Sequence, residues 1–168
     1  MALCVFTLGL SACEDSGTES VQCGQTELQA VMDAVNQERQ ANGLGILRVD
    51  VRLVDAAQGH AQNMADSLFV GHTGSDGSTA VDRVSAEGYT PTTVLEVVAA
   101  GPGTGEDIVA GWLAEPTQAQ FLRSPAVQHI GVGRAEGGTG SSGTCWCVVL
   151  AATEGAIQTT PDGCHPSP

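Results

Sequence analysis

A single carboxylate, Glu96, stands in an otherwise apolar segment from Val94 to Ala99, and His72 stands in the polar, glycine-rich segment from Gly71 to Ser78. Burying a carboxylate without a partner is costly, so Glu96 must find a donor such as His72, an arginine or a backbone N–H. Imidazole and carboxylate groups serve general acid–base catalysis and zinc binding, but they also form ion pairs that only stabilise a fold. Both interpretations stay open at this point.

The N-terminal stretch from Ala2 to Cys13 is uncharged and apolar, and an acidic, polar stretch follows it. This pattern is typical of an export signal and a solvated tether, and the apolar run is shorter than the roughly 20 residues that a membrane-spanning helix needs. Leu10-Ser11-Ala12-Cys13 resembles the lipobox of bacterial lipoproteins, which implies cleavage before Cys13 and a diacylglyceryl group on its thiol. An ordinary signal peptide that leaves Cys13 free is the alternative. Because no Lys or Arg follows Met1, we expect the natural start to lie upstream.

These features predict an extracytoplasmic protein that is lipid-anchored to a bacterial membrane at the cell envelope, or else secreted. Two or three acyl chains, at roughly 0.8 kcal/mol per buried CH₂, would make the anchoring essentially permanent. We divide the chain into a signal peptide (1–12), a lipidated cysteine with an acidic tether (13–24), one folded domain (25–154) and a tail with Cys164 (155–168).

Four cysteines remain once the signal is removed and Cys13 is lipidated: Cys23, Cys145, Cys147 and Cys164. An even number in an exported chain favours two disulfides, each worth about 2–4 kcal/mol. Cys145 and Cys147 alternate with Trp146 in an apolar segment, so they point to one face of a strand and pair poorly with each other. We therefore expect one of them to bind Cys23 and the other Cys164. A zinc site is the alternative, although paired C-x₂-C motifs are absent.

The charge of the chain excludes one class of partner. Its formal net charge is −13, and all 6 basic residues are arginines. Without a basic stripe, binding to the phosphate backbone of a nucleic acid has no electrostatic basis. An acidic surface is also repelled by anionic headgroups, so contact with a membrane should run through the lipid on Cys13.

Helical periodicity predicts helices over about 26–41, 51–67, 79–87 and 104–114, and apolar segments predict strands over 94–99, 129–135 and 144–153. Thr26 is expected to cap the first helix with Gln29 completing a capping box, and Pro116 to stop or bend the fourth. Helices that precede a terminal antiparallel hairpin indicate an α+β fold.

The chain contains three further histidines. His60 falls on the apolar face of the second helix, so we expect a core histidine whose ring nitrogens are satisfied locally. His129 and His165 carry no motif and are expected at the surface.

Six short motifs stand in one order and at one spacing: Val35-Asn36-Gln37-Glu38-Arg39, His60-Ala61-Gln62-Asn63-Met64, Gly71-His72-Thr73-Gly74-Ser75-Asp76-Gly77-Ser78 with Asp82-Arg83, Gly111-Trp112-Leu113, Ser124-Pro125 and Ile130-Gly131-Val132-Gly133. Together they resemble the bacterial branch of the CAP superfamily of cysteine-rich secretory proteins, antigen 5 and pathogenesis-related proteins. The resemblance covers roughly residues 27–153. It implies a three-layer α-β-α sandwich with a small antiparallel sheet, extracytoplasmic and disulfide-stabilised, with a central cleft.

In much of this superfamily two His and two Glu line the cleft and can hold a divalent metal such as Zn²⁺. Carried over to this chain, the first His falls on His72, the first Glu on Glu96 and the second Glu on Glu115. The second His is replaced by Gln118, whose neutral amide is a poor metal ligand. Glu96 also lacks the usual Gly before it and Asn after it. The resemblance therefore implies an incomplete site, in which zinc is the one candidate cofactor.

The incomplete cleft and the lipid anchor favour a non-catalytic module that binds a protein or a small molecule at the cell envelope. The alternative is a metal-assisted hydrolase in which His72 acts with Glu96 or Glu115, one carboxylate serving as general base toward a metal-bound water. A serine nucleophile has little support because no G-x-S-x-G motif is present. A lipid or sterol groove, known in other branches of the superfamily, has no specific support in these residues.

Overall fold

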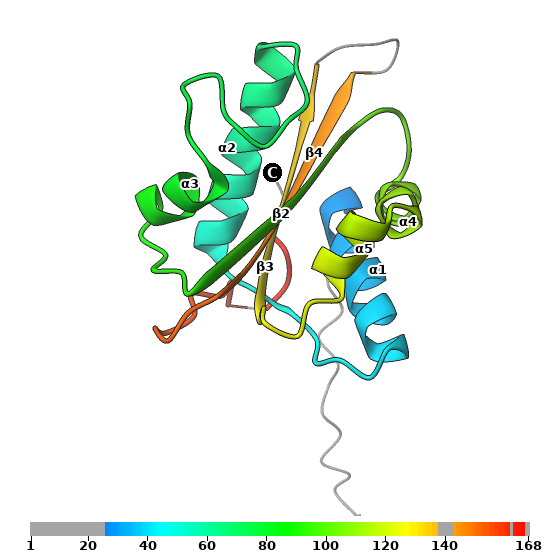
Figure 1. Ribbon diagram of the computed structural model, residues 1–168, viewed down its shortest axis with the longest axis vertical. Helices are drawn as coiled ribbons and strands as arrows, with labels where there is room; N and C mark the ends of the chain where they lie inside the picture. The colour runs from blue at the N-terminus through cyan, green and yellow to red at the C-terminus, as the bar shows by residue number, and fades with distance from the viewer. Residues whose placement is uncertain (1–25, 138–142, 162, 167–168) are drawn as a thin grey trace, which may run out of the picture.

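The computed structural model of the protein describes residues 26–137, 143–161 and 163–166. These residues form five helices and four strands, in the order α1 (Glu27–Ala41), β1 (Arg48–Val49), α2 (Val51–Asp66), α3 (Ala80–Ala86), β2 (Thr93–Ala100), α4 (Gly105–Ala114), α5 (Pro116–Leu122), β3 (His129–Glu136) and β4 (Thr144–Ala152). Figure 1 shows three layers, with α2 and α3 on one side of the sheet and α1, α4 and α5 on the other. The predicted α-β-α sandwich is confirmed.

The sheet has the strand order β1-β3-β4-β2. β4 pairs antiparallel with both β3 and β2, whereas the short β1 pairs parallel with β3. The sheet is therefore mixed and not purely antiparallel as expected. β2 forms one edge of this sheet, and it is the strand nearest the viewer in Figure 1.

Strand β4 separates two hydrophobic cores, and all nine of its residues are buried. Trp146, Val148 and Leu150 pack with α1, α4 and α5. Cys145, Cys147 and Val149 alternate with them and pack with α2. This alternation is the period of a β-strand covered on both faces.

Two glycines in β3 allow α2 to lie directly on the sheet. A Cβ at Gly131 would collide with the backbone of Leu53, and one at Gly133 with the backbone of Ala57. The sequence Ile130-Gly131-Val132-Gly133 thus places small residues toward α2 and branched ones toward the other core.

Helix capping follows the sequence, with one difference. The Thr26 side chain accepts a hydrogen bond from Gln29 N, but the Gln29 side chain binds Asp33 and the backbone N–H of His165. The prediction of a capping box at α1 is therefore wrong. Reciprocal boxes form instead at α3, between Thr79 and Asp82, and at α4, between Thr104 and Asp107.

Helix α5 and strand β1 were not expected from the sequence. Pro116 occupies the first position of α5, where its missing N–H removes no helical hydrogen bond. The same proline that ends α4 therefore begins the next helix, and Glu115 lies at the junction as C-cap of one and N-cap of the other.

The predicted disulfide scheme is wrong for the two strand cysteines, because Cys145 and Cys147 are both free thiols. They do point to one face of β4, but α2 covers that face and keeps both inside the core. Cys164 is disulfide-bonded, and neither of these two is its partner. Cys23 lies outside the described residues.

The histidines expected at the surface are both buried, so that expectation is wrong as well. His129 begins β3, and the His165 ring accepts a hydrogen bond from Val132 N. The C-terminal segment thus packs against the domain instead of leaving it.

The predictions for the signal peptide, the lipid on Cys13 and the tether fall on residues outside the described part of the chain. In the part that is described, no helix is long and apolar enough to cross a membrane.

Candidate functional site

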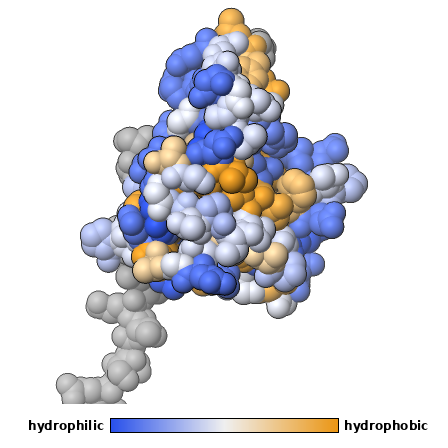
Figure 2. Space-filling view, turned by 60° about the vertical axis from the view of Figure 1, so that its left-hand side comes forward, coloured by the Kyte–Doolittle hydropathy of each residue, from blue (hydrophilic) through white to orange (hydrophobic). Residues whose placement is uncertain are grey.

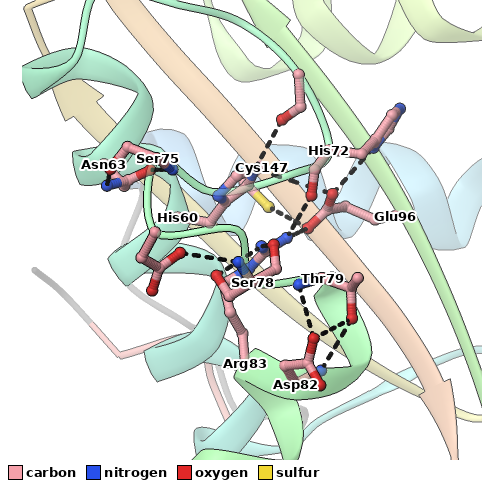
Figure 3. Close-up of polar contacts among 12 residues, drawn as sticks. His60, Asn63, His72, Ser75, Ser78, Thr79, Asp82, Arg83, Glu96 and Cys147 are labelled. Carbon is pink, nitrogen blue, oxygen red and sulfur yellow. Dashed lines mark hydrogen bonds and ion pairs between the residues drawn. The ribbon is translucent and has the colours of Figure 1, made fainter.

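Glu96 is the centre of a polar cluster at the edge of the sheet (Figure 3). It lies on β2, and the residue is only 5% exposed. His72 Nδ1 donates to its Oε1 at 2.9 Å, and Arg83 Nη2 donates to its Oε2 at 2.6 Å. The thiol of Cys147 lies 3.5 Å from Oε2, and His60 Nε2 lies 3.9 Å from Oε1. Both carboxylate oxygens are thus engaged by the protein itself.

Arg83 is positioned by α3 and in turn holds the loop that carries His72. The Thr79–Asp82 capping box starts α3 directly after the loop. Arg83 Nη1 donates to Ser78 O at 2.9 Å, and Nη2 donates to His72 O at 3.1 Å. One guanidinium therefore joins both ends of the loop to the buried carboxylate.

Further hydrogen bonds give the His72 loop a defined shape. Asn63 of α2 accepts from Ser75 N at 2.9 Å and donates to Ser75 Oγ at 2.7 Å. Gly74 N donates to Ser78 O, and Gly77 adopts a positive φ of 86° that favours glycine. The loop is thus built to hold His72 in place, while the side chain of His72 remains 63% exposed.

His60 lies beneath the loop and is fully buried. Its Nε2 donates to Gly71 O at 2.8 Å, while its Nδ1 has no hydrogen-bond partner among the described residues. Burial lowers the pKa of His60, and the Gly71 bond and the charge of Glu96 only partly oppose this. His60 is therefore a neutral core histidine, as expected, but the expectation that both ring nitrogens are satisfied is wrong.

Cys147 completes the cluster from β4. Burial raises the pKa of its thiol well above the usual value, and the charge of Glu96 adds to the shift. A thiol that stays protonated is a weak nucleophile. Cys147 is thus a hydrogen-bond donor to the carboxylate and not a reactive group.

The four residues expected to line the cleft are not assembled as a set. His72 and Glu96 are in contact, whereas Glu115 is exposed at the α4–α5 junction. Gln118 lies on α5, with its Oε1 buried and without a hydrogen-bond partner among the described residues. No hydrogen bond or ion pair between described residues joins either of them to His72 or Glu96.

These residues do not fit a divalent metal. No group of three or more His, Cys, Asp or Glu side chains within the described residues is arranged to hold one. The Arg83 guanidinium also occupies Glu96 Oε2, so a second cation near that oxygen would be repelled. The described residues therefore do not provide the donor set that a zinc site requires.

Sequence reasoning missed two partners of Glu96. Arg83 stands in the Asp82-Arg83 motif, but only the fold shows that α3 brings it to β2. Cys147 contacts Glu96 because Val149 stands opposite Glu96 and Cys147 is the next residue on the same face. That strand register could not be read from one sequence.

The outer edge of β2 carries unpaired backbone groups. Gly101 N donates to Thr144 O, and with the β2–β4 register this directs the odd-numbered residues of β2 toward β4. The even-numbered ones face outward, and Trp112 Nε1 donates to the outward carbonyl of Val98 at 3.1 Å. The outward N–H and C=O groups of Val94 and Glu96 have no partner among the described residues.

The α-β-α sandwich with a His–Glu pair at the edge strand defines an SCP-like domain. The profile of the cysteine-rich secretory protein family (CAP) matches residues 32–150, and the chain therefore belongs to this family. It is also 30% identical over 109 residues to the uncharacterized protein YkwD of Bacillus subtilis (strain 168). The matched segment covers 65% of this chain and 42% of YkwD. The chain thus matches less than half of that relative.

Solved structures show the same fold. An outer surface protein from Borrelia burgdorferi superposes with a TM-score of 0.67 at 20% identity, over 74% of this chain and 91% of that one. An extracellular protein with an SCP domain from Bacillus anthracis str. Ames gives 0.68 at 22% identity, over 76% of this chain and 40% of that one.

Proposed function

We propose that this protein is a non-catalytic binding module of the CAP family, held at the cell envelope by lipid on Cys13. The main support for this proposal is that both carboxylate oxygens of Glu96 are hydrogen-bonded within the protein, one to His72 and the other to Arg83. A general base needs a carboxylate directed at its substrate, and a metal site needs several converging ligands. Glu96 offers neither, so the cluster serves to hold the His72 loop against the sheet.

The site suits an extended peptide segment as its ligand. The outward backbone groups of Val94 and Glu96 form a template for an added strand. The exposed imidazole of His72 lies beside this edge and can contact a side chain of the ligand. With a net charge of −13, the protein favours a neutral or basic peptide.

Exposed apolar side chains, some of them close to the loop in the sequence, support the same ligand class. Figure 2 shows hydrophobic surface gathered in the middle of one face, with hydrophilic surface around it. Leu68 and Val70, just before His72, are exposed, and so is Val81, two residues before Arg83. These side chains offer contacts for apolar residues of a bound strand.

The extracytoplasmic location is part of the proposal. Of the two similar structures, one is named an outer surface protein and the other an extracellular protein. The apolar stretch and the lipobox-like Leu10-Ser11-Ala12-Cys13 agree with export and anchoring. The membrane would then be a partner only through the lipid.

Hydrogen exchange on the full chain tests the binding edge. A ligand is first selected from a random peptide library. In the free protein, we expect the amides of Val94 and Glu96 to exchange fast, and those of Leu95 and Val97, which face β4, to be protected. The bound peptide should protect Val94 and Glu96 and leave Leu95 and Val97 unchanged. Protection elsewhere, with no change at β2, would refute this binding mode.

A turnover assay tests the non-catalytic part. The full chain is incubated with peptide and ester substrates, with and without added Zn²⁺, and compared with His72→Ala. We expect no turnover above background in either protein and no zinc uptake by calorimetry. Turnover that is lost in His72→Ala would establish the hydrolase alternative instead.

A further inference from the structure

Two of the six arginines lack a carboxylate partner among the described residues, and they line the same pocket. Arg52, Arg83, Arg123 and Arg134 each form an ion pair with an Asp or Glu. Arg39 and Arg48 form none with the described residues, and both line a pocket of about 430 Å³. The residues that line this pocket include no Asp or Glu. In a chain of net charge −13, the lining of this pocket therefore carries only positive side-chain charge.

Arg39 supplies a fixed charge from the α1 side of the pocket. It is buried, and its guanidinium donates to Gly45 O at 2.8 Å, to Leu122 O at 2.9 Å and to Ser124 O at 2.8 Å. These carbonyls satisfy N–H groups without cancelling the charge. In Figure 1 the loops that follow α1 and α5 lie side by side at the base of the molecule. Arg39 joins these two loops.

Arg48 and His129 stand side by side, as the first residues of the parallel strands β1 and β3. They are Cα partners in the register, and both line the pocket. Arg48 is exposed, so its guanidinium can turn toward a ligand. His129 is only 6% exposed and lies on the pocket wall.

Tyr89 fixes which ring nitrogen of His129 carries the proton. The Tyr89 hydroxyl lies 2.7 Å from His129 Nδ1, and it has no other hydrogen-bond partner among the described residues. Burial raises the pKa of Tyr89 to about 12, so the hydroxyl keeps its proton and donates it to Nδ1. His129 then presents Nε2–H, for which the described residues provide no acceptor. His129, a lining residue of the pocket, thus carries a donor that the described residues leave unused.

We infer that this pocket binds a small oxyanion, a carboxylate or a phosphate, carried on a ligand with an apolar body. The planar fork of Arg48 can pair with either oxyanion through two hydrogen bonds, whereas Arg39, whose Nε and Nη1 already donate to carbonyls, contributes mainly its charge. The volume falls in the range of small-molecule sites. Leu44, Ile46, Pro125 and Val127 form an apolar wall, of which Ile46 is 54% exposed. This site is separate from the Glu96 cluster and does not depend on the function proposed there.

NMR titration of the full chain with two probes, sodium acetate and inorganic phosphate, tests this site. Ionic strength is held constant with NaCl, because screening alone shifts exposed signals. We expect saturable shifts at the amides of Gly45, Arg48 and His129, with a millimolar dissociation constant. Binding of acetate alone would identify a carboxylate site and binding of phosphate alone a phosphate site. Shifts that fail to saturate for both probes would overturn the inference.

Matched variants test whether Arg48 is responsible for binding the anion. Arg48→Gln should weaken binding at least tenfold, whereas Arg134→Gln, which removes the same charge from an arginine paired with Glu136, should leave it unchanged. Arg48→Lys, which keeps the charge but not the fork, should give an intermediate loss. Equal binding by wild type and Arg48→Gln would contradict the assignment.

Discussion

The Glu96 cluster and the pocket with Arg39 and Arg48 differ in the partners of their arginines. In the Glu96 cluster, Arg83 lies 2.6 Å from a buried carboxylate and also binds two carbonyls of the His72 loop. In the pocket lined by Arg48 and His129, the first residues of β1 and β3, Arg39 and Arg48 have no carboxylate partner within the described residues. In the first region the arginine is paired with a carboxylate, whereas the lining of the second region contains two arginines and no Asp or Glu. This difference is the basis for the structural role proposed for Arg83 and the ligand-binding role proposed for the pocket arginines.

The outer side of β3, beyond the two residues that pair with β1, and the outer side of β2 differ in a similar way. On β3, Gln58 binds both the N–H and the C=O of Arg134, and His165 binds the N–H of Val132. On β2, among the described residues, only Trp112 reaches an outward backbone group, the carbonyl of Val98. An uncovered edge is a liability that proteins usually avoid. The unpaired groups of Val94 and Glu96 beside His72 are the reason for proposing strand addition at this edge.

The largest effect should come from removing the carboxylate of the Glu96 cluster. Glu96→Ala leaves the Arg83 guanidinium, 12% exposed, without its counter-charge, and such losses cost about 3–5 kcal/mol of unfolding free energy. The control is Glu136→Ala, which breaks an ion pair whose carboxylate is 72% exposed and should cost at most about 1 kcal/mol. Urea unfolding measures both. Similar values for the two variants would mean that the Glu96 cluster contributes no more than a surface pair.

Acid should destabilise the protein, because three buried histidines take up protons more readily in the unfolded chain than in the fold. Burial lowers the pKa of His60, His129 and His165, so in the unfolded chain they bind protons at higher pH than in the fold. Stability is thus fully present above the unfolded pKa of about 6.5 and is lost as pH falls toward the folded values. Each histidine can contribute a slope of up to roughly 1.4 kcal/mol per pH unit.

Urea unfolding at pH 7, 6 and 5 measures this slope. His60→Gln should reduce it, and so should His129→Gln if the pocket histidine is neutral in the fold. A slope that is unchanged in both variants would show that neither ring takes up a proton on unfolding.

The smallest effect concerns the two strand thiols. Neither Cys145 nor Cys147 should react with a thiol reagent at pH 8 in the folded protein, because burial raises the pKa of both. Both should be labelled after unfolding without a reductant, as mass spectrometry of peptides would show. Cys147→Ala should cost about 1–2 kcal/mol, since it removes a donor to Glu96 and leaves a small cavity.

Cys145→Ala serves as the control for this last comparison, because its thiol lies 3.8 Å from a carbonyl and contacts no carboxylate among the described residues. We expect a smaller cost. Labelling of either cysteine only after reduction would show that it forms a disulfide, in contradiction to the free thiols of the structure.

Local signals in the sequence predicted most elements of the fold. Apolar periodicity located α1, α2 and α4, and the apolar runs located β2, β3 and β4 within one or two residues. Helix α5 was missed because Pro116 both ends one helix and begins another, which a single residue type does not distinguish. β1 has only two residues and no periodicity to detect.

The site was harder to predict, because its contacts join distant segments. The resemblance pointed to His72 and Glu96, and the cost of a buried carboxylate indicated that Glu96 needs a donor. The roles of Arg83 and Cys147 depend on the position of α3 and on the register of β2 and β4. The burial of His129 and the open pocket beside it depend on Tyr89 and β1, which no motif connected.

One pair of variants tests the central comparison most directly. Arg83→Gln and Arg48→Gln make the same substitution in the Glu96 cluster and in the pocket, and urea unfolding without added anion measures each. We predict that Arg83→Gln costs about 3–5 kcal/mol, since it leaves Glu96 buried without its arginine. Arg48→Gln should change stability by less than about 0.5 kcal/mol, as for other exposed residues. Equal costs, or a larger cost for Arg48→Gln, would contradict this account of the two regions.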